Sequence, residues 1–486
     1  WSAHIKHLKE RSEARVNILR RLSGSRWGMS TRSLLTVQRA LVRQMVAYHL
    51  PVLYGISNTA ERTMQSVLTK GLKICLGVPR ATSNVLATAE AREPPLDVMR
   101  TQEIARHYLR LNIRHDKHPL ARKLIYRNSQ FSQAIAPYRR NLPKTQMLRE
   151  TQHPPWSLEL PRICTSVPGV HQPKSAVPSA VLRQHCLSLM ERHCKSIAIF
   201  TDGSTTPSSS ASAFVIPQHK KEGMVRLSHK TSSTTAELVA TQLAIQYVAA
   251  QQPPTAWIIY CDSKAGLKAI HSFLGNGCTA QTVCQILIEY QKCRATGHEI
   301  ALQWIPGHVG IGGNQAADEL ADLAHLSSAT HPVGYSRTDV RALLRSQSQE
   351  MCRRQWLQQP RDSSLLHHID PELKFCVPST LPRPIQTLLH RFRLNVPYGR
   401  QFLHKVGRAD SPNCTACATV EDTEHILMHC TRYTSQRAIL KAALGRLDSR
   451  AFDIAKVLGV WASNKRDAAL TALVKFVQTC GMDTSY

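Results

Sequence analysis

The sequence predicts an α/β fold in its middle part, with a five-stranded mixed sheet and flanking helices between two mainly helical regions. Three observations support this prediction. Short apolar runs alternate with amphipathic stretches in the middle part, prolines separate it from the residues before it, and positive charge is concentrated on either side of it. The expected order of elements there is βββαβααβα, which is typical of a mixed sheet covered by helices.

The N-terminal region, residues 1–150, is expected to be helical. Apolar residues recur at helical spacing over 34–46 and again over 64–76, and a proline follows each run. Between 151 and 190, six prolines occur among serines and glutamines. This composition predicts an extended, weakly structured linker and therefore a domain boundary.

The middle domain, residues 191–330, contains the expected sheet. Apolar and β-branched runs predict its strands, and amphipathic stretches predict its helices. The expected strands are 197–200, 211–216, 224–229, 257–260 and 299–305. The expected helices run from about Thr235 to before Pro253, over 264–273, over 280–294, and onward from about Asn314.

The C-terminal part is expected to consist of a connecting segment, 331–384, and a small basic region, 385–486. Helical patterns occur in the latter at 434–446 and 466–479. A cluster of cysteine and histidine residues precedes these helices. Six basic residues lie just before that cluster: His390, Arg391, Arg393, Arg400, Lys405 and Arg408.

The charge of the chain predicts a polyanionic partner. The formal net charge is +29, and nucleic acid is the leading candidate because phosphates would neutralise this surplus. The net charge is +18 over 1–150 and +9 over 331–486, whereas 191–330 contains 10 basic and 10 acidic residues. We therefore expect the neutral middle to perform chemistry that needs carboxylates and the basic flanks to hold the substrate.

Other features narrow the class of protein. No apolar run is long enough to span a membrane, and no signal peptide opens the chain. The 14 cysteines are mostly scattered, which does not suggest a secreted disulfide framework. We expect a soluble, intracellular protein of the nucleus or cytoplasm, and Trp1 as first residue suggests a fragment of a longer reading frame.

Two aspartates stand at the ends of predicted strands. Asp202 closes the first strand and Asp262 the fourth, so parallel pairing of these strands would place both carboxylates at one edge of the sheet. Glu237 and Asp318 lie on predicted helices. Taken alone, the pair Asp202-Gly203 is typical of a turn. Asp262 followed by a serine is, by itself, typical of a helix cap. Together, four carboxylates would repel one another unless divalent cations compensate, and two Mg²⁺ or Mn²⁺ ions ~4 Å apart fit phosphodiester hydrolysis.

The end of the middle domain resembles a known family. The stretch from Trp304 to Ala321, WIPGHVGIGGNQAADELA, is similar to the C-terminal signature of the ribonuclease H family. The motifs TDGS at 201–204, TAE at 235–237 and CDS at 261–263 fit the same family in the same order. The resemblance covers about 130 residues of the middle domain.

The resemblance implies a ribonuclease H-like fold and hydrolysis of the RNA strand of an RNA/DNA hybrid. It implies metal ligation by Asp202, Glu237, Asp262 and Asp318, proton transfer and product release assisted by His308, and substrate contacts at Gly203, Ser204, Ser263 and Asn314. One departure is visible, because the segment from Asp262 to the strand at 299 lacks a basic protruding helix. This absence puts substrate binding by the middle domain alone in doubt.

A second set of candidate ligands is Cys414, Cys417, His425 and Cys430. Three thiolates and one imidazole at this spacing suit tetrahedral Zn²⁺. Free thiols in a small helical domain are the alternative, and His429 is a possible substitute ligand. With the basic residues just upstream, we expect this zinc knuckle to organise an RNA or DNA contact.

The combination of these regions resembles the C-terminal part of a non-LTR (LINE-like) retrotransposon polyprotein. The segments 48–55, YHLPVLYG, and 91–96, AREPPL, are similar to the thumb-side region that follows the reverse transcriptase of such elements. The reverse transcriptase portion of the same polyprotein is thus an expected partner. Two alternatives stay open: an integrase- or transposase-like nuclease, disfavoured by the His308 loop and Asp318, and a non-catalytic nucleic-acid-binding remnant.

Overall fold

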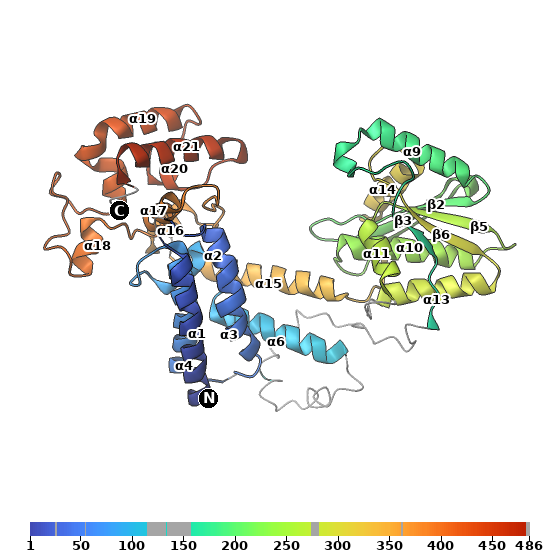
Figure 1. The fold of residues 1–486 in the computed structure, drawn as a ribbon, viewed down its shortest axis with the longest axis horizontal. Coiled ribbons are helices and arrows are strands. Elements are labelled where there is room, and N and C mark those ends of the chain that lie inside the picture. Colours follow the sequence, from blue (N-terminus) through green and yellow to red (C-terminus); the bar gives the residue numbers. More distant parts are fainter. Residues whose placement is uncertain are drawn as a thin grey trace. The chain divides into compact units, whose positions relative to one another are not determined.

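The computed structural model describes residues 1–24, 27–53, 55–113, 133, 157–273, 281–360 and 363–482. Two compact units divide these residues: a sheet-containing unit that holds 157–344, and a helical unit that joins 1–107 to 345–482 (Figure 1). No helix in the described ranges is both long and apolar enough to cross a membrane.

The sheet has seven strands in the order β1-β6-β5-β2-β3-β4-β7. The predicted mixed α/β fold is confirmed, and its five strands correspond to β2 through β6. The edge strands β1 and β7 were not predicted, because two or three residues are too few to show an alternating pattern. The strands are β1 Arg162–Cys164, β2 Ile197–Asp202, β3 Ala211–Ile216, β4 Lys221–Leu227, β5 Ala256–Cys261, β6 Glu299–Trp304 and β7 Thr330–His331.

The register of the sheet sets which residues meet at its edge. Strands β2, β3 and β4 form an antiparallel meander, whereas β5 pairs in parallel with both β2 and β6. Thr201 of β2 is the partner of Cys261 of β5. The next residue on each chain, Asp202 and Asp262, therefore leaves the sheet at the same edge.

Helices cover both faces of the sheet. Figure 1 shows α9 and α14 on one side and α10, α11 and α13 on the other. Helix α10 is apolar almost all round because it packs between β3 and α13. The helices of this unit are α9 Ser179–Arg192, α10 Ser233–Ala249, α11 Lys264–His271, α13 Gln281–Ala295 and α14 Gly312–Ala324, with short 3₁₀ turns η4 Lys174–Ala176 and η5 Pro217–His219.

The described part of the expected linker, 157–190, is folded. It contains β1, η4 and most of α9, and β1 extends the sheet by pairing in parallel with β6. Leu182, Cys186 and Leu189 of α9 are buried in the core of the sheet unit. The prolines lie between these elements. The sequence predicted a linker because the polar composition of this stretch concealed the apolar spacing of α9. Residues 151–156 lie outside the described ranges.

The N-terminal helices of the other unit confirm the predicted helical region as far as residue 113. Apart from residue 133, the rest of the region to residue 150 lies outside the described ranges, as does Tyr54 of the thumb-like segment. The elements are α1 Ser2–Leu22, α2 Thr31–Gln38, the π-helix η1 Arg39–Arg43, α3 Gln44–His49, α4 Asn58–Leu76, α5 Asn84–Glu90 and α6 Leu96–Ile113.

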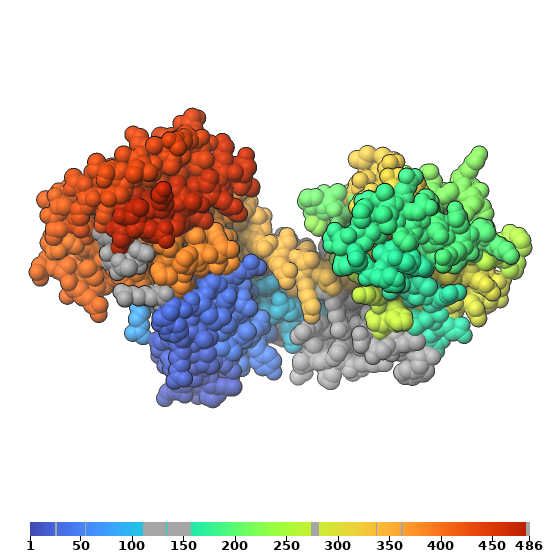
Figure 2. All heavy atoms as spheres, turned by 45° about the horizontal axis from the view of Figure 1, so that its top comes forward, coloured from blue at the N-terminus to red at the C-terminus, as the bar shows by residue number. Residues whose placement is uncertain are grey.

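The C-terminal helices pack against these N-terminal helices, so the two basic flanks form one unit. Figure 2 shows the C-terminal residues, orange to red, continuous with the blue N-terminal ones, and α17 contacts both α2 and α4. The expected connecting segment is itself largely helical. The elements are α15 Arg337–Leu357, α16 Leu365–Ile369, α17 Arg383–Arg393, α18 Arg400–Lys405, η7 His425–His429, η8 Thr431–Tyr433, α19 Thr434–Gly445, α20 Ile454–Leu458 and α21 Ser463–Thr479.

Two of the six basic residues that precede the cysteine cluster are buried in this unit. Arg393 bonds Glu90 at 3.1 Å and Asp370 at 2.8 Å, and its side chain is 1% exposed. His390 bonds Glu90 at 2.8 Å. Arg393 and His390 therefore bind carboxylates inside the core, where an unpaired charge would be costly, and they are not exposed to a nucleic-acid partner.

Candidate metal centres

Three carboxylates meet where β2 and β5 end. Asp202 closes β2, Asp262 follows β5, and Glu237 lies in the second turn of α10; one oxygen of each lies within 4.8 Å of the others. Gly203 permits this approach, because a side chain at that position would collide with the backbone of Ala236 and Glu237. The strand register and one glycine thus bring together three of the four predicted ligands.

The electrostatics of this cluster call for a cation. Burial, reinforced by the charge of Asp262, raises the pKa of Asp202 to about 7. Burial and the neighbouring aspartates also raise the pKa of Glu237 well above its usual value. The pKa of Asp262 is raised by burial as well. Three negative charges are therefore unfavourable here on their own, and an all-oxygen donor set is what Mg²⁺ and Mn²⁺ prefer.

The fourth predicted carboxylate lies beside this cluster. Asp318 is on α14, and its Oδ2 is 3.7 Å from Nδ1 of His308. The charge of Asp318 nevertheless helps to raise the pKa of Asp202 and of Glu237, which shows its proximity. His308 has a positive φ of 55° and a side chain that is 76% exposed. The histidine therefore stands at the open side of the carboxylates, paired with Asp318.

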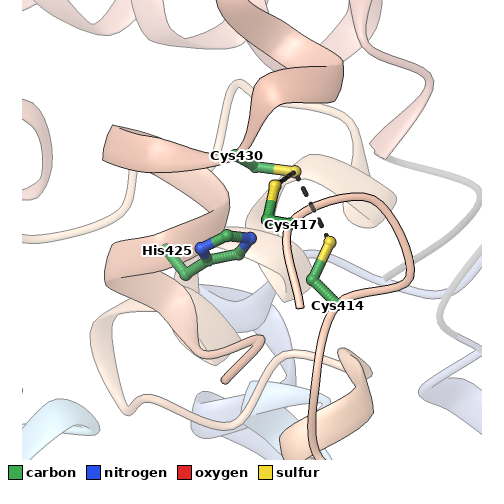
Figure 3. Close-up of side chains that lie close together, drawn as sticks. All are labelled: Cys414, Cys417, His425 and Cys430. Carbon is green, nitrogen blue, oxygen red and sulfur yellow. Dashed lines mark hydrogen bonds between the residues drawn. The ribbon is translucent and has the colours of Figure 1, made fainter. Parts of the chain in front are cut away.

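The second cluster consists of the four predicted zinc ligands. One ligand atom of each of Cys414, Cys417, His425 and Cys430 lies within 4.8 Å of the others, and Figure 3 shows the imidazole beside the three thiols. The Sγ atom of Cys430 is 3.9 Å from the Sγ atoms of both Cys414 and Cys417. The cluster is compatible with a zinc knuckle.

The environment of the cluster fits a zinc ion. Nδ1 of His425 is hydrogen-bonded to the Thr419 hydroxyl at 3.1 Å, while its Nε2 is buried without a partner in the described part of the chain. A histidine fixed through one nitrogen, with the other free, is typical of metal ligation. Hydrogen bonds from Thr431 lower the pKa of the Cys417 thiol to about 7, which favours the thiolate form that binds metal. His429, the alternative ligand, is exposed and lies outside the cluster.

Comparison with known proteins identifies the region around the carboxylates. Residues 194–325 match the sequence model of the RNase H family. These residues are an RNase H domain. Among curated proteins, none matches the chain. The matched range includes the three clustered carboxylates, Asp318 and His308, and it excludes the cysteine cluster.

Ser204 of the RNase H domain, a predicted substrate contact, is engaged within the protein. Its hydroxyl donates to Oδ1 of Asp322 at 2.7 Å and lies 3.1 Å from Nε2 of His325. The charge of Asp322 is also among the causes of the raised pKa of Asp202. Ser204 therefore links the end of β2 to α14, and substrate contact at Ser204 and at Gly203 stays a prediction.

Two other predicted contacts support Asp262 and the helix behind it. Ser263 caps α11, accepting a hydrogen bond from the Gly266 amide at 3.2 Å. Asn314 is buried and hydrogen-bonds Asp262. This bond lowers the pKa of the Asp262 carboxyl and so partly offsets the increase caused by burial. Sequence reasoning placed Asn314 on the substrate and missed this bond, which the motif alone does not reveal.

The zinc assignment predicts a difference between two neighbouring histidines. Purified full-length protein should contain about one zinc per chain. His425→Ala should lose most of it, because the imidazole is the fourth ligand, whereas His429→Ala should retain it as a matched control. Elemental analysis of the three proteins after dialysis is the measurement. Equal zinc in both variants would contradict the assignment.

Proposed function

We propose that the RNase H domain hydrolyses the RNA strand of RNA/DNA hybrids with the help of divalent cations. The observation that supports this most is the buried cluster of Asp202, Glu237 and Asp262 inside the family-matched region. A cluster of like charges at the ligand-binding edge of a sheet serves no purpose in stability. It fits a centre that binds cations and phosphate.

The residues of the site have separate roles in this proposal. Asp202, Glu237 and Asp262, with Asp318 beside them, would hold two Mg²⁺ or Mn²⁺ ions. Bound ions of this kind supply an activated water and charge compensation for the leaving oxygen. Asn314 keeps Asp262 oriented through its hydrogen bond. The exposed imidazole of His308, 3.7 Å from Asp318, transfers a proton at the open side of the cluster and assists release of the product.

We also propose that the chain derives from the polyprotein of a LINE-like retrotransposon, whose reverse transcriptase portion would be its partner. The order of the regions supports this: N-terminal helices with thumb-like segments, an RNase H domain, and a Cys₃His cluster after it. In that setting the substrate would be the hybrid left by reverse transcription.

The test is cleavage of an end-labelled RNA/DNA hybrid. Asp262→Asn should abolish cleavage while the fold and hybrid binding in Ca²⁺ persist, because the substitution keeps the shape but removes a metal-binding charge. Wild-type protein that leaves the hybrid intact in both Mg²⁺ and Mn²⁺ would overturn the proposal in favour of a non-catalytic nucleic-acid-binding remnant.

His308→Ala should slow cleavage by ~10²- to 10⁴-fold, the usual contribution of an acid/base group, with hybrid binding unchanged. His325→Ala is the matched control, because this second histidine contacts Ser204 and Ser209 and not Asp318. Turnover of His308→Ala at the wild-type rate would remove His308 from the mechanism.

A groove in the helical unit offers a place for the nucleic-acid backbone. It lies along α1 and α4 and has a volume of about 930 Å³. Among the described residues that line it, the one acidic residue, Glu13, is paired with Lys70 at 3.2 Å. Hydroxyl groups such as those of Thr59 and Ser66 line it as well. Its basic lining residues are Lys9, Arg20, Arg62, Lys70, Lys73 and Arg80. We propose that this groove holds phosphates, as the uneven charge of the sequence suggests.

This proposal predicts the salt dependence of hybrid binding. Each phosphate neutralised by Lys or Arg changes the slope of log affinity against log salt by about −0.9 on duplex DNA. The triple variant Lys9→Gln, Arg62→Gln, Arg80→Gln should therefore bind more weakly, with a slope shallower by about 2 to 3. The control is Lys268→Gln, Lys292→Gln, Arg294→Gln in the RNase H domain. Binding is measured across a salt series in Ca²⁺, and equal slopes for both triple variants would exclude the groove.

A further inference from the structure

The segment that precedes the family-matched region is part of the same folded unit. Residues 157–192 lie outside the range 194–325, yet β1 pairs in parallel with β6. Leu158 and Val167 are buried in the same core as the central strands. This segment therefore has a fixed position on the RNase H domain.

The segment reaches the loop that contains His308 at two points. Nζ of Lys174, in η4, donates a hydrogen bond to the carbonyl oxygen of Gly307 at 2.6 Å. The side chain of Arg183, on α9, lies against Gly310, where an added Cβ would be 3.5 Å from its Cδ. The contacts thus fall one residue before His308 and two residues after it.

Buried side chains anchor this loop after His308, where Val309 and Ile311 pack in the core, whereas the position directly before it is Gly307. Glycine occupies positions 307 and 310 of the loop, and Gly310 has a φ of 85°. Glycine loses more conformational freedom on ordering than any other residue. The side chain of His308 is largely exposed and lies 3.7 Å from Asp318. The Lys174 bond therefore restrains the backbone at the position next to His308 that has no side chain.

The Lys174 ammonium also lies on the carboxylate side of the loop. Its charge is among the influences that lower the pKa of Asp262. Gly307, whose carbonyl it binds, is itself packed so closely on Asp262 that a side chain there would collide with the carboxylate. Lys174, Gly307 and Asp262 thus form one contiguous row beside His308.

We propose that Lys174 is a positioning residue for the RNase H reaction, holding the loop so that His308 faces the reacting phosphate. The segment 157–192 is then a functional part of the nuclease site. This proposal rests on the proposed hydrolysis of hybrids, and it assigns to Lys174 an effect on turnover that is exerted through His308 and not through binding of the substrate.

The test compares Lys174→Ala with Lys174→Arg, using Lys230→Ala as the matched control. Lys230 also donates to a backbone carbonyl in the same unit, that of Pro207 at 3.0 Å, which does not belong to the loop that contains His308. Lys174→Ala should lower the single-turnover rate about 10- to 100-fold and leave the hybrid Kd in Ca²⁺ unchanged. Lys174→Arg, which can still donate to the carbonyl, should restore most of the rate, and Lys230→Ala should match wild type.

Two further readouts separate this role from others. In a His308→Ala background, Lys174→Ala should lower the single-turnover rate little further, because both substitutions remove the same function. Independent, additive losses would overturn the proposal, as would a weakened Kd with a shallower salt slope, which would instead identify Lys174 as a phosphate contact.

The second readout does not depend on activity. Amide hydrogen exchange of residues 307–311 should be faster in Lys174→Ala than in wild type or Lys230→Ala, and unchanged exchange would refute the positioning role. Absence of cleavage by the wild-type protein would refute the proposed function alone, because the exchange comparison still decides whether Lys174 fixes the loop.

Discussion

The parallel pairing of β2 with β5 forces two aspartates to the same edge of the sheet, and the rest of the site follows from that constraint. With Thr201 opposite Cys261, neither Asp202 nor Asp262 can move away without breaking the ladder. Helix α10 adds Glu237 through the gap left by Gly203. The resulting repulsion is maintained by the folding energy of the sheet and its helices, and it is relieved only by protonation or by cations.

The parts of this site that depend on a local sequence pattern could be predicted from the sequence. Strand ends at Asp202 and Asp262 could be predicted because both follow short apolar runs, whereas the parallel pairing of the two strands was only a condition, which the structure meets. The sequence also indicated the zinc ligands, since the spacing of three cysteines and a histidine is local. The choice of His425 over His429 needed the structure, which buries the first and exposes the second.

Other features could not be predicted because they depend on contacts between distant segments. Lys174 lies in a stretch whose prolines suggested a linker, and nothing local shows that its ammonium meets Gly307, 133 residues away. Likewise Arg393 belongs to the basic stretch just before the cysteine cluster, yet it binds Glu90 and Asp370 in the core. Local charge cannot distinguish a cation that faces solvent from one that compensates a buried carboxylate.

The buried Arg393 joins the two halves of the helical unit. Its two halves are separated in the chain by the whole RNase H domain, and the Glu90–Arg393–Asp370 ion pairs join them, so that removing one partner would leave an uncompensated buried charge. A buried cation of this kind does not contribute to the positive charge at the surface. The cations that line the groove between α1 and α4 account better for an interaction with phosphates.

Mn²⁺ binding followed by electron paramagnetic resonance tests whether the three buried carboxylates form a divalent cation centre. Zinc-loaded wild-type protein should bind about two Mn²⁺ ions, and Asp262→Asn should bind fewer and more weakly. Because the pKa of Asp202 is raised to about 7 without metal, binding should release more protons at pH 6 than at pH 8. No Mn²⁺ binding by the wild-type protein, or equal binding by Asp262→Asn, would contradict the account.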